Sequence, residues 1–272
     1  MSLDKNINEI KLGIAISTYS NENTSLDRYS IIDKSLESLN NYLKNTSLKI
    51  YTIIIVDGPV PKKHLEILNK YNFNIYFRKI NGGVACAKNT SIKKLLENKI
   101  DIGILLDDDV SYYTDCFEKY VESMIKCNLH HMLYCQMDET IRPKNQWKKH
   151  QYYKVKINNH YVMRHRGRGV GCLLTFTPEL IDKIGYFKVM SGKYGYEHIN
   201  FTYRAIESKL ISNAYDIMDS EKYIDHIGFE HIGEGKFKKI HSICEKERIL
   251  ENNKNKNDWN TDLKKYIEIV EY

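Results

Sequence analysis

Short apolar runs alternate with segments of helical periodicity over the first 110 residues. The run Lys49–Val56 (KIYTIIIV) is rich in β-branched residues, which is typical of a strand buried on both faces. Strands are predicted at Leu12–Thr18, Lys49–Val56, Asn74–Lys79 and Ile102–Leu106, and helices at Leu26–Leu43, His64–Tyr71 and Gly83–Leu96. This alternation predicts an α/β fold with a doubly wound, mostly parallel sheet flanked by helices, whose ligands bind at the carboxyl ends of the strands.

The second half of the chain is less regular. It contains predicted strands at Met132–Gln136 and Gly171–Phe176, a Tyr-rich hairpin within Gln151–Met163, and helices at Pro178–Ile184 and Glu197–Ser208. Beyond residue 236 the sequence becomes strongly charged and predicts a helical tail. We therefore expect one domain over residues 1–235, followed by a charged helical C-terminal extension over residues 236–272.

The composition is that of a globular protein. Hydrophobic residues make up 42% of the chain and charged residues 28%, which is too apolar for a disordered protein. No apolar run approaches the roughly 18–20 residues of a membrane-spanning helix, and the N-terminus lacks the hydrophobic core of a signal peptide. The six cysteines are scattered without a C-x-x-C pair, which favours reduced thiols in a cytoplasmic protein over a disulfide framework or a zinc site.

Three consecutive carboxylates, Asp107, Asp108 and Asp109, directly follow the predicted strand Ile102–Leu106. Like charges this close repel one another, so a cation is expected to neutralise them. A hard divalent cation, shared with the phosphates of a substrate, would serve this purpose. A solvated acidic turn is the alternative interpretation.

Three further motifs carry candidate chemistry. In the segment NGGVACAKN, two glycines open a helix without the spacing of a Walker or a dinucleotide-binding motif, so they indicate either close ligand approach or packing. Glu197 and His198 begin another helix, either as a favourable N-terminal acid or as a general base. His226 and His231 have carboxylates between and before them and are either metal ligands or structural residues.

Six segments in order carry a resemblance to a known family. The chain reads GIAISTYS, IIIVDGP, NGGVACAKN, LLDDDV, GVGCLLTFTPELIDKIGYF and GYEHINFTYRA. Together they resemble glycosyltransferase family 2, the nucleotide-sugar transferases with the GT-A fold, over roughly residues 12–233. The resemblance implies a nucleotide-binding half over about residues 12–110 and an acceptor half over residues 111–235.

The resemblance also implies roles for individual residues. It places Thr18, Tyr19 and Asp57 at the nucleotide base, usually uracil, and it places Asn81, Gly82, Gly83 and Lys88 along the nucleotide pocket. Asp107 and Asp108 fall in the motif that meets the ribose and the sugar, while Asp109, Asp107 and His226 are the implied ligands of Mn²⁺ or Mg²⁺. His231 is the less favoured alternative to His226.

One departure concerns the catalytic base. The second acid of the family's Glu-Asp motif is usually this base, and here His198 stands in its place after Glu197. Either residue is a candidate. Glu197 is slightly favoured, because a carboxylate stays available over a wider pH range, whereas a histidine beside a metal can be displaced or protonated.

The implied activity is a metal-dependent, inverting transfer of a hexose or N-acetylhexosamine. The donor would be a nucleotide diphosphate sugar, most plausibly UDP-linked, and the acceptor a hydroxyl on a glycan or glycoconjugate, as in polysaccharide biosynthesis. No nucleic-acid partner is expected, and the cytoplasmic protein is free to contact a membrane peripherally. A nucleotidyltransferase is an alternative, but its Gly-rich loop is absent after the first predicted strand; a nucleic-acid-binding module would leave the Asp triplet unexplained.

The net charge of +6 is located in one part of the chain. Residues 140–178 contain nine Lys and Arg residues and no acid, so the rest of the chain is slightly acidic. Arg164, Arg166 and Arg168 are candidates for binding the diphosphate or an anionic acceptor. A solvated basic loop is the alternative.

Overall fold

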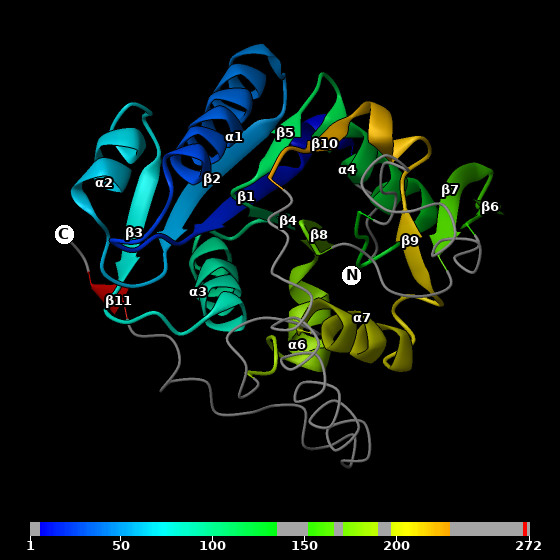
Figure 1. Ribbon diagram of the computed structural model, residues 1–272. Helices are drawn as coiled ribbons and strands as arrows, with labels where there is room; N and C mark the ends of the chain where they lie inside the picture. Colours follow the sequence, from blue (N-terminus) through cyan, green and yellow to red (C-terminus); the bar gives the residue numbers. More distant parts are fainter. Residues whose placement is uncertain (1–5, 135–151, 166–170, 190–196, 229–268, 271–272) are drawn as a thin grey trace, which may run out of the picture.

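A six-stranded, mostly parallel sheet forms the centre of the molecule (Figure 1). The computed structural model describes residues 6–134, 152–165, 171–189, 197–228 and 269–270. In spatial order the strands are β11 (Ile269–Val270), β3 (Asn74–Arg78), β2 (Lys49–Val56), β1 (Lys11–Thr18), β4 (Ile102–Asp107) and β8 (Leu173–Phe176). The four inner strands are parallel and the two outer strands are antiparallel, which confirms the predicted fold class.

Helices cover both faces of this sheet. The crossover helices are α1 (Leu26–Asn45), α2 (Lys62–Leu68) and α3 (Val84–Glu97). Figure 1 shows α1 and α2 on one side of the sheet and α3 on the other, as expected for a doubly wound fold. Ser25 caps α1 by accepting a hydrogen bond from the Arg28 main chain, and Ile32, Leu36 and Leu39 form its buried stripe.

A second layer of elements follows the central strands in sequence. Its three-stranded antiparallel sheet consists of β6 (Tyr152–Ile157), β7 (His160–His165) and β9 (Ala214–Asp216), accompanied by α4 (Cys116–Cys127), α6 (Pro178–Ile184) and α7 (Glu197–Glu207). Two short 3₁₀ helices span Ile7–Glu9 and Ser220–Lys222. Asn158 and Asn159 turn the β6–β7 hairpin with positive φ angles of 47° and 65°, a conformation that asparagine tolerates well. The predicted hairpin is confirmed.

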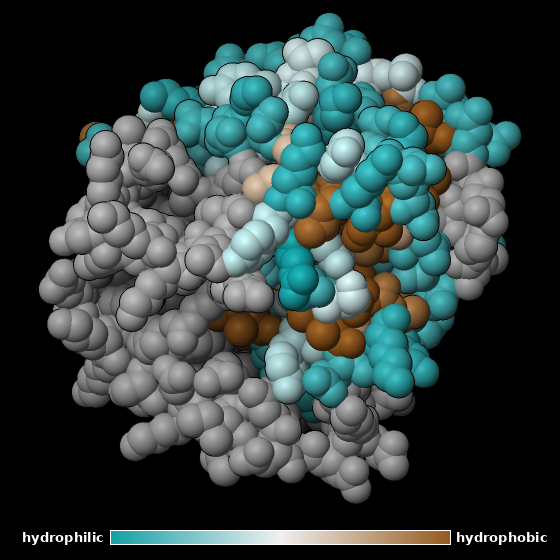
Figure 2. All heavy atoms as spheres, turned by 90° about the vertical axis from the view of Figure 1, so that its right-hand side faces the viewer, coloured by the Kyte–Doolittle hydropathy of each residue, from teal (hydrophilic) through white to brown (hydrophobic). Residues whose placement is uncertain are grey.

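The side of the molecule that carries the hairpin shows hydrophobic residues emerging between hydrophilic ones (Figure 2). On the hairpin itself, Tyr153 and Tyr161 are exposed, and the Lys154 ammonium lies 4.2 Å from the centre of the Tyr161 ring. Lys154 and Lys156 belong to the basic segment identified in the sequence. Part of that positive charge is therefore presented on a defined strand surface.

Two parts of the second half differ from prediction. Of the predicted strand at Met132–Gln136, only residues 132–134 are described; there Leu133 forms an isolated bridge with Leu174, and its main-chain N–H donates to the Tyr215 carbonyl. The segment up to Tyr134 is thus shared between two sheets, which interrupts a regular ladder. In the predicted helical tail, Ile269–Val270 instead form strand β11; residues 236–268 lie outside the described residues.

The topology brings the predicted site residues to one edge of the sheet. Thr18, Asp57 and Asp107 stand at the carboxyl ends of the strands β1, β2 and β4, respectively, which lie side by side in the sheet. Beyond Asp107 the chain turns into β5 (Val110–Tyr112), which pairs with β10 (Ile224–His226). This pairing places the late histidine next to the acidic turn.

Candidate active site

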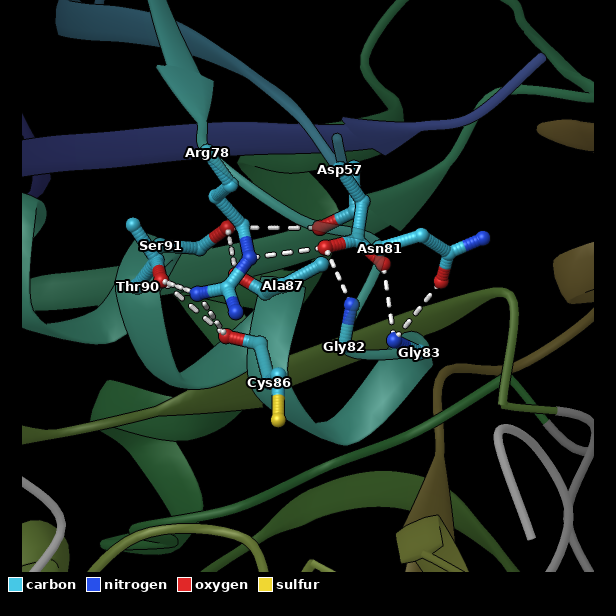
Figure 3. A network of polar contacts seen from close by, with 10 residues as sticks. Asp57, Arg78, Asn81, Gly82, Gly83, Cys86, Ala87, Thr90 and Ser91 are labelled. Atoms are coloured by element: carbon cyan, nitrogen blue, oxygen red, sulfur yellow. Dashed lines mark hydrogen bonds and ion pairs between the residues drawn. The ribbon is translucent and has the colours of Figure 1, made fainter. Parts of the chain in front are cut away.

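The buried carboxylate of Asp57 forms the first part of the site (Figure 3). Its Oδ1 accepts hydrogen bonds from Arg78 Nε at 2.7 Å and from the Gly82 main chain at 3.2 Å. Its Oδ2 accepts from the Gly83 N–H at 2.8 Å, and the Asn81 side chain accepts from the same N–H at 3.0 Å. Gly83 has a φ of 85°, which few other residues adopt, so glycine allows this loop to fold onto the carboxylate.

Arg78 is a site residue that sequence reasoning missed. Its guanidinium also donates to the Cys86 carbonyl at 3.2 Å and to the Thr90 hydroxyl at 2.5 Å, and Arg78 is only 4% exposed. The sequence does show the two residues at corresponding places: Arg78 ends β3, and Asp57 follows the neighbouring strand β2. Their pairing becomes visible only once the register of these two strands is known.

Each aspartate of the triplet meets a different basic side chain. Asp107 Oδ1 lies 3.1 Å from Lys88 Nζ, Asp108 is paired with Arg28, and Asp109 Oδ1 lies 3.3 Å from His226 Nε2. The three partners come from α3, α1 and β10. The cationic surroundings that the triplet requires are therefore supplied by three distant parts of the chain.

Lys88 is the buried centre of the second part of the site. Its ammonium donates to the Gly171 carbonyl at 3.0 Å as well as pairing with Asp107, and the residue is 1% exposed. Burial lowers the pKa of Lys88, but the carboxylates of Asp107 and Glu197 outweigh burial and raise that pKa above its ordinary value. Lys88 is consequently a fixed positive charge between the acidic turn and the start of α7.

Glu197 and His198 lie together at this corner. Glu197 Oε1 is 3.5 Å from His198 Nδ1, while Glu197 Oε2 is buried and has no hydrogen-bond partner among the described residues. Burial acts to raise the pKa of Glu197; His198 and then Lys88 overcome it and lower that pKa to about 2. A Cβ on Gly171 would lie 2.7 Å from His198 Nδ1, so the strand approaches the imidazole as closely as a glycine permits.

Packing between α3 and α7 holds Lys88 and Glu197 in register. Asn89, which follows Lys88, donates to the Phe187 carbonyl at 2.9 Å and accepts from the Phe187 N–H at 2.8 Å. The Phe187 ring stacks on Phe201 of α7 with centroids 4.3 Å apart. The asparagine that closes the NGGVACAKN segment thus links the two helices, a role that the sequence did not reveal.

The third part of the site is formed by Asp109 and His226, whose side chains are candidate ligands of a divalent metal. Asp109 Oδ1 is buried, makes no hydrogen bond within the described part of the chain, and faces an imidazole nitrogen; carboxylate oxygen and imidazole nitrogen are both common metal ligands. Burial acts to lower the pKa of His226, but the Asp109 carboxylate raises it overall. Across the described ranges, no group of three or more His, Cys, Asp or Glu side chains is arranged to hold a metal, since Asp107 faces Lys88 instead. Asp109 and His226 fit as two ligands that need further oxygen atoms from a substrate.

The remaining predicted residues have different surroundings. Tyr19 is 41% exposed in the loop after β1. Thr18 and Asp108 are buried, and the Thr18 hydroxyl donates to the Asp108 carboxylate, so their predicted contact with the donor requires a rearrangement. Arg166, Arg168 and His231 lie outside the described residues.

The mostly parallel sheet flanked by helices is similar to the GT-A fold of glycosyltransferases. The family model for glycosyl transferase family 2 matches residues 14–193. The chain is 35% identical to the uncharacterized glycosyltransferase R363 of Acanthamoeba polyphaga mimivirus over 269 residues, which are 96% of both proteins. The chain therefore belongs to glycosyltransferase family 2 and is a glycosyltransferase.

Solved structures share the fold at low sequence identity. TarS residues 1–349 from S. aureus match with a TM-score of 0.55 and 15% identity over 79% of this chain and 60% of that chain. The same protein in complex with UDP matches with a TM-score of 0.57 and 16% identity over 92% of this chain and 68% of that chain. This chain thus spans about three fifths of the first of these structures. No helix in its described part combines the length and apolarity needed to cross a bilayer.

Proposed function

We propose that this glycosyltransferase uses a nucleotide diphosphate sugar, UDP-linked, and transfers a hexose or N-acetylhexosamine to a hydroxyl of a glycan or glycoconjugate, as in polysaccharide biosynthesis. The observation that carries the proposal is Lys88, whose buried charge joins Asp107 of the acidic turn to Glu197 of the acceptor half. TarS, which shares the fold, has been solved with UDP and with UDP-GlcNAc. These complexes support the choice of donor.

The nucleotide base would bind at the Asp57 corner. In the structure the Asp57 carboxylate accepts from Arg78 and from the main chains of Gly82 and Gly83, so a base that binds here would take the place of one of these donors. The half-exposed Tyr19 ring lies at the same edge of the sheet and would pack against the base. Asn81, Gly82 and Gly83 would line this pocket, while Arg166 and Arg168 remain predicted contacts for the diphosphate or an anionic acceptor.

Asp109 and His226 would hold Mn²⁺ or Mg²⁺, with the remaining ligands supplied by the diphosphate. A metal bound there would offset the negative charge that develops on the departing nucleotide diphosphate. Asp107 and Lys88 would orient the ribose and the sugar from the other side of the turn. We thus propose a metal-dependent reaction in which Asp107 and Lys88 position the donor beside the metal ligands.

The acceptor hydroxyl would lose its proton to His198. Glu197, with its low pKa, is a weak base, but it faces Nδ1 and would orient the imidazole so that Nε2 takes the proton. The hydroxyl oxygen then forms a bond to the anomeric carbon while the bond to the nucleotide diphosphate breaks with its electron pair. A single displacement of this kind inverts the anomeric configuration. The geometry thus favours His198 over Glu197, the reverse of the preference based on sequence.

A thermal-shift panel of nucleotide diphosphates and their sugars, with and without Mn²⁺, tests the proposal directly. Stabilisation by one UDP-sugar that requires Mn²⁺ is expected, because a ligand at 100 times its Kd stabilises the folded state by about 2.7 kcal/mol. Asp109→Asn should abolish both the Mn²⁺-dependent stabilisation by the UDP-sugar and the transfer. Metal-independent binding, or a product with retained anomeric configuration by NMR, would contradict the metal role or the single displacement, respectively.

We also propose that the enzyme works in the cytoplasm, with peripheral membrane contact where its acceptor is lipid-linked. Cys86, Cys116, Cys127 and Cys172 are free and buried, which suits a reducing compartment. Mass spectrometry after alkylation of protein unfolded without reductant should find all six cysteines alkylated. A disulfide in freshly isolated protein would contradict this location.

A further inference from the structure

One face of α1 contacts the segment that carries the three aspartates. Arg28 pairs with Asp108, Ser35 Oγ donates to the Val110 carbonyl at 2.8 Å, and Ser38 Oγ accepts from the Tyr112 N–H at 2.7 Å. These three α1 residues are spaced by seven and three positions, which places them on one side of a helix. We call Arg28, Ser35 and Ser38 the α1 rail.

The rail holds β5 from the side opposite β10. Ser38 also donates to the Tyr112 carbonyl at 3.1 Å. The serine hydroxyl therefore forms hydrogen bonds with both the N–H and the C=O of Tyr112, as a neighbouring strand would do. On the other edge, β10 pairs His226 with Val110, and the Ile227 N–H donates to the Asp109 carbonyl at 2.9 Å. The acidic turn and the histidine strand are therefore fixed to α1 as one unit.

At the front end of the rail, Asp108 is anchored inside the protein. Its side chain is 6% exposed, and it accepts hydrogen bonds from Arg28 and from the Thr18 hydroxyl. Thr18 in turn contacts His64 Nε2 at 3.2 Å, and Ser20 contacts His64 Nδ1 at 2.5 Å. Without the guanidinium, the buried Asp108 carboxylate would lose its cation and would have to move towards water.

We propose that Arg28 is a positioning residue for the donor and metal site, a proposal that rests on the proposed function. Asp108 lies between Asp107 and Asp109 in the chain, so its anchor sets where the two neighbours point. One neighbour meets Lys88 and the other meets His226, on opposite sides of the turn. Arg28 pairs with Asp108, and it acts on the two neighbouring carboxylates through that side chain.

The test compares Arg28→Met and Arg28→Lys with two control variants, one at a residue of α1 and one at a residue that pairs with α1. Lys70→Met removes the exposed ion pair between Lys70 and Asp33, and Ser38→Ala removes a rail contact to the main chain of Tyr112 and none to an aspartate side chain that the structure shows. Calorimetry measures the Kd of UDP with and without Mn²⁺, and thermal unfolding gives each Tm. Arg28→Met should raise the Kd of UDP with Mn²⁺ about 10-fold to 100-fold, as loss of a supporting contact does in metal sites. Arg28→Lys should recover part of that loss.

The controls separate positioning from stability. Lys70→Met and Ser38→Ala should keep the wild-type Kd for UDP with Mn²⁺, even where Ser38→Ala lowers the Tm. An Arg28→Met protein that binds UDP and Mn²⁺ like the wild type, at a temperature well below its Tm, would overturn the positioning role alone. A wild-type protein that binds UDP neither with nor without Mn²⁺ would overturn the proposed function and this role together.

A double variant covers the case in which Arg28→Met does not fold. Arg28→Met combined with Asp108→Asn removes the buried charge along with its partner, which relieves the unpaired carboxylate. The turn still lacks its anchor, so a raised Kd for UDP with Mn²⁺ is expected in a protein that keeps the wild-type circular dichroism spectrum. Wild-type binding by the double variant would overturn the proposal.

Discussion

Lys88 shows how much of the site depends on a single buried side chain. Its ammonium contacts Asp107 and the Gly171 carbonyl, and its charge stabilises ionised Glu197. In an interior of low effective dielectric, such an arrangement is stable only while both signs of charge are present. The residue therefore belongs at once to the stability of the fold and to the proposed chemistry.

Lys88→Met should remove the positive charge that Asp107 and Glu197 share. Breaking a buried ion pair from one side costs about 3–5 kcal/mol, so urea unfolding should show a loss of that order. Transfer should fall together with stability, because Asp107 loses its orienting partner. Lys93→Met, at an exposed position of the same helix, should change neither quantity. Undiminished transfer by Lys88→Met would remove this lysine from the donor site.

Glu197 makes stability depend on acidity in a definite direction. Its pKa is about 2 in the folded protein against an ordinary value of 4.5, so its ionised form stabilises the fold above about pH 4.5. That contribution, about 3 kcal/mol at most, should vanish as the pH falls from about 4.5 to 2. Glu197→Gln should flatten the dependence of the unfolding free energy in this window, whereas Glu66→Gln, at a largely exposed position, should not. Equal slopes for wild type and Glu197→Gln would contradict the low pKa.

At the scale of elements, the close approach of β8 and α7 sets the position of the proposed base. Gly171 immediately precedes β8, and its missing side chain leaves room for the His198 ring at the start of α7. α7 is held by Phe201 against Phe187 and by the Thr202 hydroxyl, which contacts His131 Nε2 at 2.8 Å. Small changes in this contact should therefore affect chemistry more than folding.

Gly171→Ala should displace His198, because the new Cβ would lie 2.7 Å from Nδ1. A displacement of about 1 Å in a catalytic group costs on the order of 100-fold in rate, so kcat should fall that far while the KM for the donor stays close to wild type. Gly13→Ala is the matched control: it crowds the flexible ends of Ile100 and Leu95 in the core and should lower the Tm without this split between kcat and KM. A proportionate change in both constants would place Gly171 outside the proton-transfer step.

The sequence predicted the elements whose ends are marked by local sequence signals. β2 and α6 begin and end where the pattern of apolar residues, Pro178 and Gly185 places them. The partners of the charged residues could not be predicted, because the pairing of Arg78 with Asp57 depends on strand register and that of Arg28 with Asp108 on helix position. The candidate carboxylates were thus found from the sequence, whereas the basic residues that hold two of them were not.

At the scale of the whole molecule, the sheet has an edge that distant residues protect. β11 pairs antiparallel with β3, with Ile269 opposite Arg78 and Val270 opposite Phe77. This ladder covers the outer side of the strand that contributes Arg78 to the nucleotide corner. An uncovered strand edge presents unpaired main-chain groups that readily pair with another chain.

Deletion of residues 269–272 should therefore have two effects. Loss of a few main-chain hydrogen bonds, each worth about 1 kcal/mol net, should lower the unfolding free energy modestly. The freed edge of β3 should also promote self-association, which light scattering would detect as a mass that rises with protein concentration. Replacing Ile269 and Val270 by alanines is the matched control, because it keeps the main-chain ladder and should leave the protein in its wild-type state of association. If the deletion variant keeps the wild-type mass and unfolding free energy, β11 does not protect this edge in solution.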